Sequence, residues 1–373
     1  MDERIKRLVI KKEECCGCGA CAAICPVGAI RMVQDHEGFF YPCIDHAACI
    51  KCGKCIDVCV LENRQTEKHA NLYFGVQAKN NEIRYSSSSG GFFSILAEYV
   101  LSRQGIVYGA GYDSEMNVLH KGVQEIYQME QIKRTKYVQS NMEGIYHKIQ
   151  KHLENDRLVL FCGTPCQTHA LKSYLQKTYE KLIAVDLICY GVPSPGIWKK
   201  YVNYIEQKHR GKMTDFSFRD KRNGDNGHAC SYKIDGKEYV GSLYSDKYCM
   251  LYFMKLILRP SCHKCIFCSV ERDSDFTIGD FWGIENVRKD MDDGMGTSIV
   301  ITHTLRAEEI WNSVKDNAAW FACKIEEVSQ PRLIEPTNSA QGRRIIMLAY
   351  RFMPFSFIMR LMDIALWLRR KVN

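Results

Sequence analysis

Two hydrophobic patterns alternate along most of the chain, and together they predict its secondary structure. Short apolar runs typical of buried strands occur at residues 72–78, 106–112, 157–162 and 181–189. Stretches with a helical spacing of apolar residues lie at 90–105 and 164–177. Because strands joined through helices pair in parallel, this order predicts βαβ units and an α/β domain.

The N-terminal segment lacks this alternation and is rich in cysteine instead. It holds ten of the chain's 19 cysteines between residues 15 and 59, and the polar stretch 62–71 that follows is typical of a linker. An apolar and basic segment ends the chain. The predicted parts are a cysteine-rich domain at 1–64, a linker at 65–71, an α/β domain at 72–335 and a tail at 336–373. The chain is thus α/β in its main domain and α+β overall.

The composition is that of a globular protein, with 46% hydrophobic and 25% charged residues in a chain of 373. The sequence contains neither a signal peptide nor an apolar run of the roughly 18 residues that a membrane span needs. Cysteines spaced two and three residues apart in a long chain without an export signal favour metal ligation over disulfide bonds. We therefore expect a cytoplasmic protein.

Positive charge is concentrated in the tail. The net charge is +8, and residues 343–373 hold seven Lys or Arg against one acid, Asp363, so the rest of the chain is nearly balanced. This distribution gives little support to a nucleic-acid partner. Pro354 should divide the tail into two helices, and the second has a narrow polar stripe opposite a broad apolar face. Such a helix either lies on an anionic membrane surface, as in a peripheral membrane protein, or packs on the protein's own core or a second copy of the chain.

The N-terminal cysteines form an internal repeat. Two runs with the spacing Cys-x2-Cys-x2-Cys-x3-Cys are offset by 34 residues, at Cys15, Cys18, Cys21 and Cys25 and at Cys49, Cys52, Cys55 and Cys59. With this spacing, three thiolates of one loop bind one [4Fe-4S] cluster and the fourth cysteine serves the other cluster. The predicted ligands are therefore Cys15, Cys18, Cys21 and Cys59 for the first cluster, and Cys25, Cys49, Cys52 and Cys55 for the second. Zinc is the alternative, but four cysteines would satisfy it without a doubled run.

This segment resembles a bacterial two-cluster ferredoxin domain over residues 1–64. The proline that follows the fourth cysteine in that family is present as Pro26 and is replaced by Val60 in the second half. Cys16 and Cys43 fall outside the repeated spacing. We interpret both as small apolar residues.

A second group of cysteines belongs to the α/β domain. Cys162 ends one predicted strand, Cys166 begins the helix that follows, and Cys189 ends the next strand. If the two strands are neighbours, these thiols share the sheet edge where parallel sheets bind ligands. A later loop carries Cys262, Cys265 and Cys268 and needs at least one thiol from elsewhere to complete a set of four. These parts can assemble a third [4Fe-4S] cluster.

Two other interpretations of these cysteines stay open. In the first, Cys162, Cys166 and Cys189 are buried core residues, and the loop at 262–268 holds a small zinc site. In the second, Cys162 and Cys166 form a redox dithiol at a helix N-terminus, where a thiolate is stabilised.

The ordered motifs SSSSGGFFSIL, KYVQS, GTPCQ, DLICYGVPSP, CHKC and SDFTIGDFWG resemble the family of coenzyme F420 hydrogenase/dehydrogenase beta subunits over about residues 72–300. The resemblance implies a domain that carries FAD and an iron–sulfur cluster. Relatives with an N-terminal ferredoxin module reduce diverse substrates. The cysteines that the resemblance implies as ligands are Cys166, Cys189, Cys262 and Cys265. Cys162 and Cys268 have no counterpart in the family pattern, and the substrate is not identified.

The flavin site is predicted without the help of a G-x-G-x-x-G motif, which the chain lacks. The run SSSSGG directly before a helix offers hydroxyls and free backbone amides to a phosphate group. The KYVQS motif would add a cation and further hydroxyls to this site. The first two residues of GTPCQ are included among the candidate flavin contacts. The candidate contacts are Ser88, Ser89, Gly90, Gly91, Lys136, Tyr137, Ser140, Gly163 and Thr164. The alternatives are a flexible Ser/Gly loop and a solvated face.

Together these features predict an iron–sulfur flavoprotein oxidoreductase. Electrons would pass singly through the ferredoxin-type clusters and the third cluster, and FAD would join them into two-electron transfer to or from a small molecule. The expected partner is an electron donor or acceptor protein such as ferredoxin. The alternatives are an electron-transfer subunit that serves a partner enzyme and a zinc-stabilised scaffold. No catalytic side chain is assigned.

Overall fold

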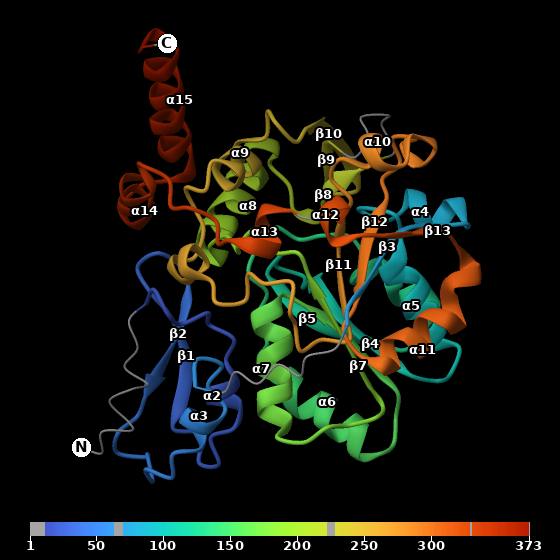
Figure 1. The fold of residues 1–373 in the computed structure, drawn as a ribbon. Coiled ribbons are helices and arrows are strands. Elements are labelled where there is room, and N and C mark those ends of the chain that lie inside the picture. Colours follow the sequence, from blue (N-terminus) through green and yellow to red (C-terminus); the bar gives the residue numbers. More distant parts are fainter. Residues whose placement is uncertain (1–11, 63–69, 222–227, 329, 373) are drawn as a thin grey trace.

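The computed structural model describes residues 12–62, 70–221, 228–328 and 330–372. Within them the chain forms three sheets of eight, three and two strands (Figure 1). The strands are β1 Ile30–Gln34, β2 Phe40–Ile44, β3 Leu72–Ala78, β4 Ile106–Tyr112, β5 Val118–Val123, β6 Val159–Gly163, β7 Leu182–Leu187, β8 Met213–Asp220, β9 Ala229–Ile234, β10 Lys237–Ser242, β11 Phe276–Asp280, β12 Ser298–Thr302 and β13 Ala318–Cys323.

The α-helices are α2 Ala20–Ala23, α3 Lys54–Asp57, α4 Asn81–Tyr85, α5 Phe92–Leu101, α6 Ile145–Glu154, α7 Pro165–Leu175, α8 Pro195–His209, α9 Lys247–Phe253, α10 Ile284–Val287, α11 Leu305–Val314, α12 Ile325–Val328, α13 Pro331–Ile334, α14 Arg343–Phe352 and α15 Phe355–Val372. Short 3-10 helices are η1 Ile126–Gln131, η2 Pro260–Lys264, η3 Lys289–Met291 and η4 Lys315–Asn317. The predicted linker at 65–71 lies largely outside the described residues. The division into four parts therefore stays a prediction.

The eight-stranded sheet contains the predicted parallel units. Its order is β13-β3-β12-β11-β7-β6-β4-β5. β4 pairs in parallel with β6, and β6 with β7, so α6 and α7 are the two crossovers, and β11 adds a parallel partner to β7. The outer strands are antiparallel to their neighbours, which makes the sheet mixed. The α/β prediction is confirmed, and the strands predicted at 72–78 and 106–112 coincide with β3 and β4.

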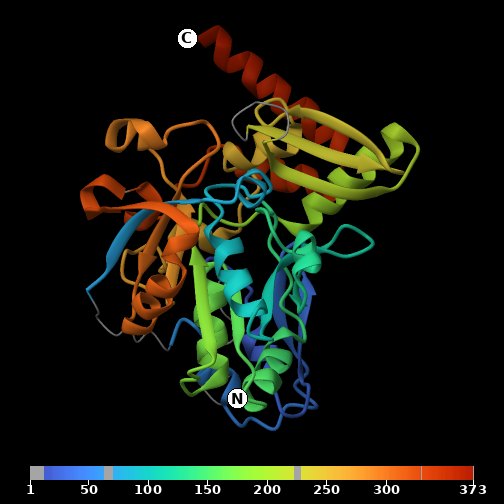
Figure 2. The same ribbon diagram turned by 90° about the vertical axis from the view of Figure 1, so that its right-hand side faces the viewer.

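Both faces of this sheet are covered by helices. Leu160 and Ile183 pack with α5 and α11 on one face, whereas Phe161 and Leu182 pack with α6 and α7 on the other (Figures 1 and 2). Since successive strand residues point to opposite faces, a sheet covered on both sides needs strands that are apolar throughout. This is why the strands appear in the sequence as continuous apolar runs.

The cysteine repeat folds as two matching halves beside α7. The short helices α2 and α3 are offset by the same 34 residues as the cysteines. Each loop passes twice through left-handed backbone, at Gly17 and Gly19 in the first half (φ 67° and 79°) and at Lys51 and Gly53 in the second (φ 59° and 80°). Ala20 of the first half belongs to the same core as α6 and α7, so the repeat is docked on the larger domain.

The remaining core lies between the three-stranded sheet, α8, α9 and the tail. Trp198 and Tyr201 of α8 share this core with Phe355 and Ile358 of α15. Pro354 separates α14 from α15, as predicted. One face of the tail thus packs on the protein's own core. Among the described helices, none combines the length and the apolar character that crossing a membrane requires.

Candidate metal centres and pocket

The first cysteine loop borders a small cavity that five cysteines share. They are the four predicted ligands Cys15, Cys18, Cys21 and Cys59, together with Cys16. Burial, with added effects of the nearby Cys15 and Cys59, raises the pKa of Cys21 to about 12. A buried thiolate is unfavourable without positive charge, which the irons of a cluster would supply. The structure thus brings together the four residues predicted for the first cluster.

The second loop gathers the other predicted set nearer to solvent. Burial raises the pKa of Cys55, and the neighbouring Cys52, Cys49 and Cys25 raise it as well. Cys52 is exposed, while Cys49 and Cys55 are half-buried. Cys25 therefore lies with the cysteines of the opposite loop, in keeping with the predicted exchange of the fourth ligand between the two halves.

Four cysteines of the larger domain come together beyond the carboxyl ends of the parallel strands. Cys166 begins α7 directly after β6, Cys189 follows β7, and Cys262 and Cys265 come from the loop that contains η2. Burial raises the pKa of Cys189 well above its usual value, and Cys262, Cys166 and Cys265 raise it further. The backbone amide of Val192 donates to Sγ of Cys262 at 3.4 Å, a type of hydrogen bond that tunes a cluster thiolate. The four residues expected to hold a third cluster are thus grouped.

Cys268 lies beside this group and is hydrogen-bonded to Cys265. The bond lowers the pKa of Cys265 to about 6 and raises the pKa of Cys268. Cys265, which the resemblance implies as a ligand, therefore has a second thiol as its hydrogen-bond partner. Cys268 is then a hydrogen-bonding neighbour of the site.

Cys162 and Cys166 belong to opposite sides of the sheet. Cys162 packs against the core formed with α5 and α11, and burial raises its pKa to about 12. Cys166 packs on the α7 side, towards the cysteine repeat, where its Sγ lies 3.2 Å from Oγ1 of Thr164. A redox dithiol needs its two sulfur atoms in contact. The arrangement therefore favours Cys166 as a ligand and leaves Cys162 in the core.

Cys16, interpreted from the sequence as a surplus apolar residue, connects two cysteine groups. Its thiol is hydrogen-bonded to Cys166 of the larger domain and to Cys18 of the first loop. The bond with Cys166 lowers the pKa of Cys16, but the bond with Cys18 and burial outweigh it, so the pKa is well above its usual value. The first loop and the third group are thus in contact through the Cys16 side chain. The repeated spacing could not reveal this role, because Cys16 stands outside it.

In the parts of the chain that the structure describes, no three His, Cys, Asp or Glu side chains converge as ligands of a single metal ion do. A structural zinc ion would draw four sulfurs into a tetrahedron around one point. A [4Fe-4S] cluster instead binds each thiolate to a different iron, so its ligands stand further apart.

The predicted phosphate loop at 86–91 is largely engaged in holding the fold. Oγ of Ser88 accepts a hydrogen bond from the Thr135 amide at 2.9 Å, which brings the two predicted flavin segments side by side. Oγ of Ser89 donates to a backbone carbonyl beside β12 at 3.0 Å. A Cβ at Gly90 would lie 2.1 Å from a carbonyl oxygen of β3, and Gly91 (φ 95°) caps α5. The glycines thus serve close packing and a helix start.

The other predicted flavin contacts are divided between two places. Nζ of Lys136 donates to carbonyls of its own loop at 2.6 and 3.1 Å. Tyr137 lies in the core next to the pocket described below. Ser140 belongs to a buried hydrogen-bond network that reaches Thr164 at the start of α7. Gly163 and Thr164 therefore lie nearer to the third cysteine group than to the pocket.

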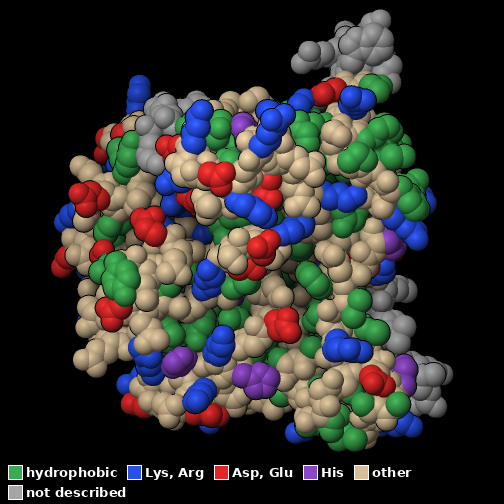
Figure 3. Space-filling model, turned by 180° about the vertical axis from the view of Figure 1, so that it is seen from behind, with side chains coloured by type: hydrophobic (Ala, Val, Ile, Leu, Met, Phe, Trp, Pro, Cys, Tyr) green, Lys and Arg blue, Asp and Glu red, His purple; other side chains and the backbone are tan. Residues whose placement is uncertain are grey.

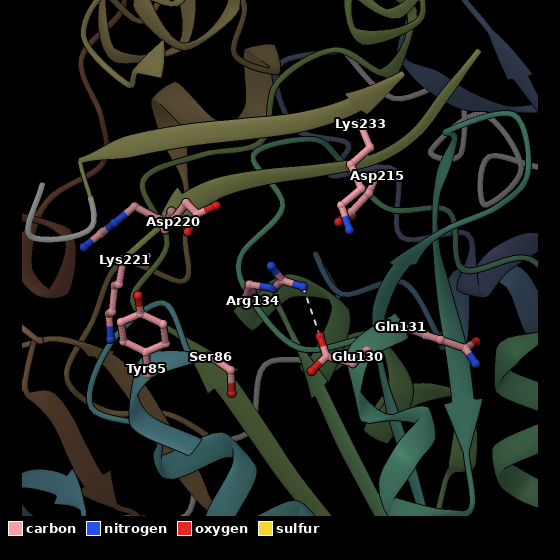
Figure 4. A pocket seen from close by; sticks show the side chains of 10 residues that line it. Tyr85, Ser86, Glu130, Gln131, Arg134, Asp215, Asp220, Lys221 and Lys233 are labelled. Atoms are coloured by element: carbon pink, nitrogen blue, oxygen red, sulfur yellow. Dashed lines mark hydrogen bonds and ion pairs between the residues drawn. The ribbon is translucent and has the colours of Figure 1, made fainter. Parts of the chain in front are cut away.

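A pocket of about 510 Å³ opens between α4, η1 and the strands β8 and β9 (Figure 4). Its volume is typical of small-molecule sites. It combines four cations with three carboxylates. The lining residues are Tyr85, Ser86, Glu130, Gln131, Arg134, Asp215, Arg219, Asp220, Lys221 and Lys233.

The cations of this pocket were not predicted. Lys221 is buried, and its Nζ donates to the carbonyls of Ser89 and Arg84 at 2.6 and 3.0 Å, which ties the pocket to the predicted phosphate loop. Burial lowers the pKa of Lys221 to about 7. Arg219 pairs with Asp280 at 2.8 Å. Arg219 and Lys221 lie together at the end of β8, but their partners Ser89 and Asp280 are distant in the sequence, so no local motif predicts these contacts.

Aromatic side chains connect the pocket to the third cysteine group. The Tyr137 hydroxyl is hydrogen-bonded to Arg219 of the pocket. The Tyr137 ring stacks on Tyr252 with centroids 4.6 Å apart. Burial, with Tyr137 and Cys189 nearby, holds the pKa of Tyr252 well above its usual value. On its other side the Tyr252 ring lies against Tyr190, with centroids 5.4 Å apart, and Tyr190 directly follows Cys189 of the third group.

Comparison with known proteins identifies the two parts of the chain. Residues 14–62 match the 4Fe-4S dicluster domain, and residues 156–328 match the family described as the C terminus of the coenzyme F420 hydrogenase/dehydrogenase beta subunit. The chain thus contains one segment similar to each of these two families, and both resemblances noted in the sequence are confirmed.

Individual relatives are distant. The chain is similar to a subunit of the F(420)H(2) dehydrogenase of Methanosarcina mazei, with 23% identity over 192 residues that cover 48% of this chain and 54% of that protein. The match thus spans about half the length of this curated relative. A solved chain of the F420-reducing [NiFe] hydrogenase complex from Methanosarcina barkeri aligns with 71% of this chain and 84% of its own length, at 18% identity and a TM-score of 0.43.

Proposed function

We propose that the protein is an iron–sulfur flavoprotein oxidoreductase. In this proposal it passes electrons between the dicluster domain and FAD, and on to or from a small-molecule substrate. One observation carries the proposal: the redox-competent parts adjoin one another in a continuous order. The first cysteine loop contacts the third cysteine group through Cys16, and Tyr252 and Tyr137 lead from that group to the pocket.

Three [4Fe-4S] clusters follow from the grouping of the thiols. The proposed ligands are Cys15, Cys18, Cys21 and Cys59, then Cys25, Cys49, Cys52 and Cys55, and finally Cys166, Cys189, Cys262 and Cys265. Each set consists of thiols alone, the donor that iron–sulfur clusters use. Cys16 and Cys268 are then neighbours that donate or accept hydrogen bonds and so tune the clusters.

The pocket beside β8 and β9 is the proposed FAD site. Its cations suit the phosphates of a dinucleotide, and the exposed ring of Tyr85 offers an apolar face. FAD, when bound, would convert one-electron steps into two-electron transfer. Arg219 and Tyr137 would border it on the side of the third cysteine group. Lys221, whose pKa lies near neutrality, could hold or release a proton at Nζ there.

The second cysteine loop is the proposed contact for a protein partner. Cys52 is exposed, and so are its neighbours Ile50, Lys51 and Lys54. An exposed apolar side chain followed by two lysines suits brief docking of an acidic electron-transfer protein such as a ferredoxin. Electrons would then enter or leave at this loop.

An electron-transfer subunit without a substrate of its own is the second candidate. It is favoured by the relative in Methanosarcina mazei, whose name describes a subunit of a dehydrogenase. In that case the pocket would face a partner enzyme or its cofactor. The clusters and their order would stay the same.

Anaerobic purification with quantitation of iron, sulfide, zinc and flavin tests the proposal. Three cubane clusters and one flavin predict about twelve irons and one FAD per chain. Turnover of a small-molecule substrate by the isolated chain would support the oxidoreductase. Iron without flavin would overturn it in favour of the electron-transfer subunit, and stoichiometric zinc without visible absorbance would reject both.

A further inference from the structure

We propose that Arg259 is a positioning residue that clamps the first cysteine loop onto the larger domain and raises the reduction potential of the first cluster. This inference rests on the proposed ligand set of that cluster, Cys15, Cys18, Cys21 and Cys59. Arg259 itself belongs to the larger domain, directly before η2. It therefore acts across the junction between the two matched domains.

The guanidinium of Arg259 contacts both the first cysteine loop and the strand pair β1–β2. Nε donates to the carbonyl of Cys15 at 2.8 Å, and Nη2 donates to the carbonyl of Phe40 at 3.0 Å. Nη2 also lies 3.9 Å from Sγ of Cys15, a proposed cluster ligand. The guanidinium carbon lies 4.2 Å from the centroid of the Tyr41 ring. One side chain thus holds the loop by hydrogen bonds, a sulfur contact and a cation–π contact.

Two further donors from the larger domain complete the clamp. Gln139 accepts from Nη1 of Arg259 at 3.0 Å and donates to the carbonyl of Cys16 at 2.8 Å. The hydroxyl of Tyr146 donates to the carbonyl of Cys18 at 2.7 Å. The carbonyls of three cysteines in one short loop therefore each receive a hydrogen bond from outside the repeat. Gln139 belongs to the KYVQS motif, so that motif contributes to the junction.

The positive charge of Arg259 is buried, and such a charge is stable only beside a negative one. The side chain is 0% exposed, yet within the described residues its hydrogen bonds go to carbonyl and amide oxygens and to a thiol. A buried cation is costly unless it is paired with negative charge. The thiolates and sulfides of a cluster beside Cys15 would supply that charge.

The same argument gives the direction of the effect on the cluster. Reduction adds negative charge, and a nearby buried cation stabilises the more negative state because solvent does not screen it. Charge and hydrogen bonds around the sulfurs are among the factors that set cluster potentials. The equivalent loop of the second half has only the exposed Lys51 and Lys54 nearby in sequence. Arg259 would therefore raise the potential of the first cluster and not that of the second.

Arg259 also adjoins the third cysteine group through the backbone. Its carbonyl accepts a hydrogen bond from the amide of Cys262 at 3.0 Å, and its amide donates to the carbonyl of Val192 at 2.9 Å. The residue that touches Cys15 is thus built into the loop that carries two proposed ligands of the third cluster. Arg259 therefore connects the first and third proposed cluster sites through its side-chain and backbone hydrogen bonds.

Reductive titration followed by electron paramagnetic resonance tests the inference on the full-length protein. In Arg259→Gln, we expect one ferredoxin-type signal to shift to lower potential while the other stays. Arg259→Lys, which keeps a charge but loses the planar fork, should shift less. Arg343→Gln is the matched control, because Arg343 is buried at the same junction and pairs with Glu37 of the repeat without touching a proposed ligand. It should leave both potentials unchanged.

The outcomes separate this inference from the proposed function. Unchanged potentials in an Arg259→Gln protein with full iron content would overturn the inference and leave the clusters in place. An equal shift in Arg343→Gln would also overturn it, since docking alone would then explain the result. If Arg259→Gln loses the first signal, the potential of the first cluster in Arg259→Lys tests the inference instead. A potential near that of the wild type would support an effect of the positive charge, and a large drop would contradict it. Absence of all cluster signals from the wild-type protein would reject the proposed function itself.

Discussion

The two halves of the cysteine repeat have the same backbone course but opposite surroundings. Position 17 and position 51 are equivalent, and both adopt left-handed backbone with φ 67° and 59°. The first is Gly17, where a Cβ would lie 2.6 Å from the Arg259 guanidinium. The second is Lys51, whose side chain is exposed. A buried junction therefore requires glycine at one position, while solvent accepts a long side chain at the other.

This difference suggests a division of labour within a duplicated motif. The inner loop is clamped by the larger domain and contacts the third cysteine group through Cys16. The outer loop presents Cys52 to solvent. Equal cysteine spacing thus produces two sites with unequal dielectric surroundings, which is a common means of setting different cluster potentials. The variants below test the comparison.

The largest effect is expected from breaking the inner connection at Cys166. Cys166→Ser should lower the iron content by about four per chain, since each cubane has its own ligand set, while both ferredoxin-type signals persist. Electron flow from the dicluster domain to FAD should fail. Cys162→Ser, which alters a core cysteine, should keep its iron. Iron analysis and spectroscopy check both variants. If both keep full iron but lose activity, a redox dithiol replaces the third cluster.

The outer loop should behave in the complementary way. Cys52→Ser is expected to remove the second cluster, again about four irons per chain. Electron exchange with an external protein should slow strongly, because the exposed entry point is lost. Transfer between the remaining clusters and FAD should continue when a small chemical reductant is supplied. Stopped-flow absorbance measures the two routes separately, and equal losses in both would contradict the distinction between inner and outer loops.

The reciprocal change of the two equivalent positions sharpens the comparison further. Gly17→Ala forces a side chain into left-handed backbone and against Arg259, so we expect a loss of about 1–3 kcal/mol of stability. Lys51→Gly should be neutral or stabilising by up to about 1 kcal/mol, because glycine relieves the backbone strain of lysine there. The half-life of cluster absorbance at a fixed temperature reports both. Similar behaviour of the two variants would show that surroundings do not distinguish the halves.

A smaller effect is expected from Tyr146→Phe. The change removes the hydroxyl that donates to the Cys18 carbonyl at 2.7 Å and leaves a buried acceptor unpaired, which typically costs about 1–3 kcal/mol. Tyr174→Phe is the control, since its hydroxyl bonds only the Gln150 side chain outside the clamp. The same half-life measurement applies. An undiminished half-life in Tyr146→Phe would argue against the clamp.

The smallest effect concerns the tail, which lies at the opposite end of the molecule from α3 (Figures 1 and 2). α14 keeps Ile345, Leu348 and Phe352 more than 60% exposed, beside the exposed Arg344 and Arg351. Figure 3 shows hydrophobic side chains gathered near basic ones at this corner. We expect weak flotation with vesicles that contain phosphatidylglycerol, reduced several-fold in a Leu348→Ser, Phe352→Ser double variant. Equal flotation of both proteins would leave only packing on the protein's own core.

Much of the scaffold could be predicted because its signals are local. The strands at 72–78 and 106–112 were found at their observed limits, since a sheet covered on both faces needs continuous apolar runs. The strands predicted at 157–162 and 181–189 correspond to β6 at Val159–Gly163 and β7 at Leu182–Leu187, so their limits differ from the observed ones by one or two residues. Cysteine spacing likewise groups the proposed ligands of the dicluster domain without any knowledge of the fold.

The flavin prediction shows where local signals mislead. A Ser/Gly run before a helix suits an anion, but Gly90 packs against β3 and Ser89 bonds the backbone beside β12. The cations Arg134, Arg219 and Lys221 that line the pocket come from two segments outside the Ser/Gly run, with Arg134 after η1 and the other two at the end of β8. Hydrogen bonds of a turn and those of a ligand site use the same residue types, so composition cannot tell them apart.

The sequence by itself determined the parallel units, the duplicated cysteine spacing and the candidate ligand sets, because each depends on residues close together or on a simple repeat. Only the tertiary structure decided that Cys166 packs towards the repeat and Cys162 in the core. The two faces of a sheet differ only in the elements that pack on them, and those elements are distant in the sequence. The tertiary structure also decided the contacts of Cys16 and Arg259. Their partners are distant in sequence, and a side chain acquires electrostatic influence only from the neighbours and the burial that folding provides.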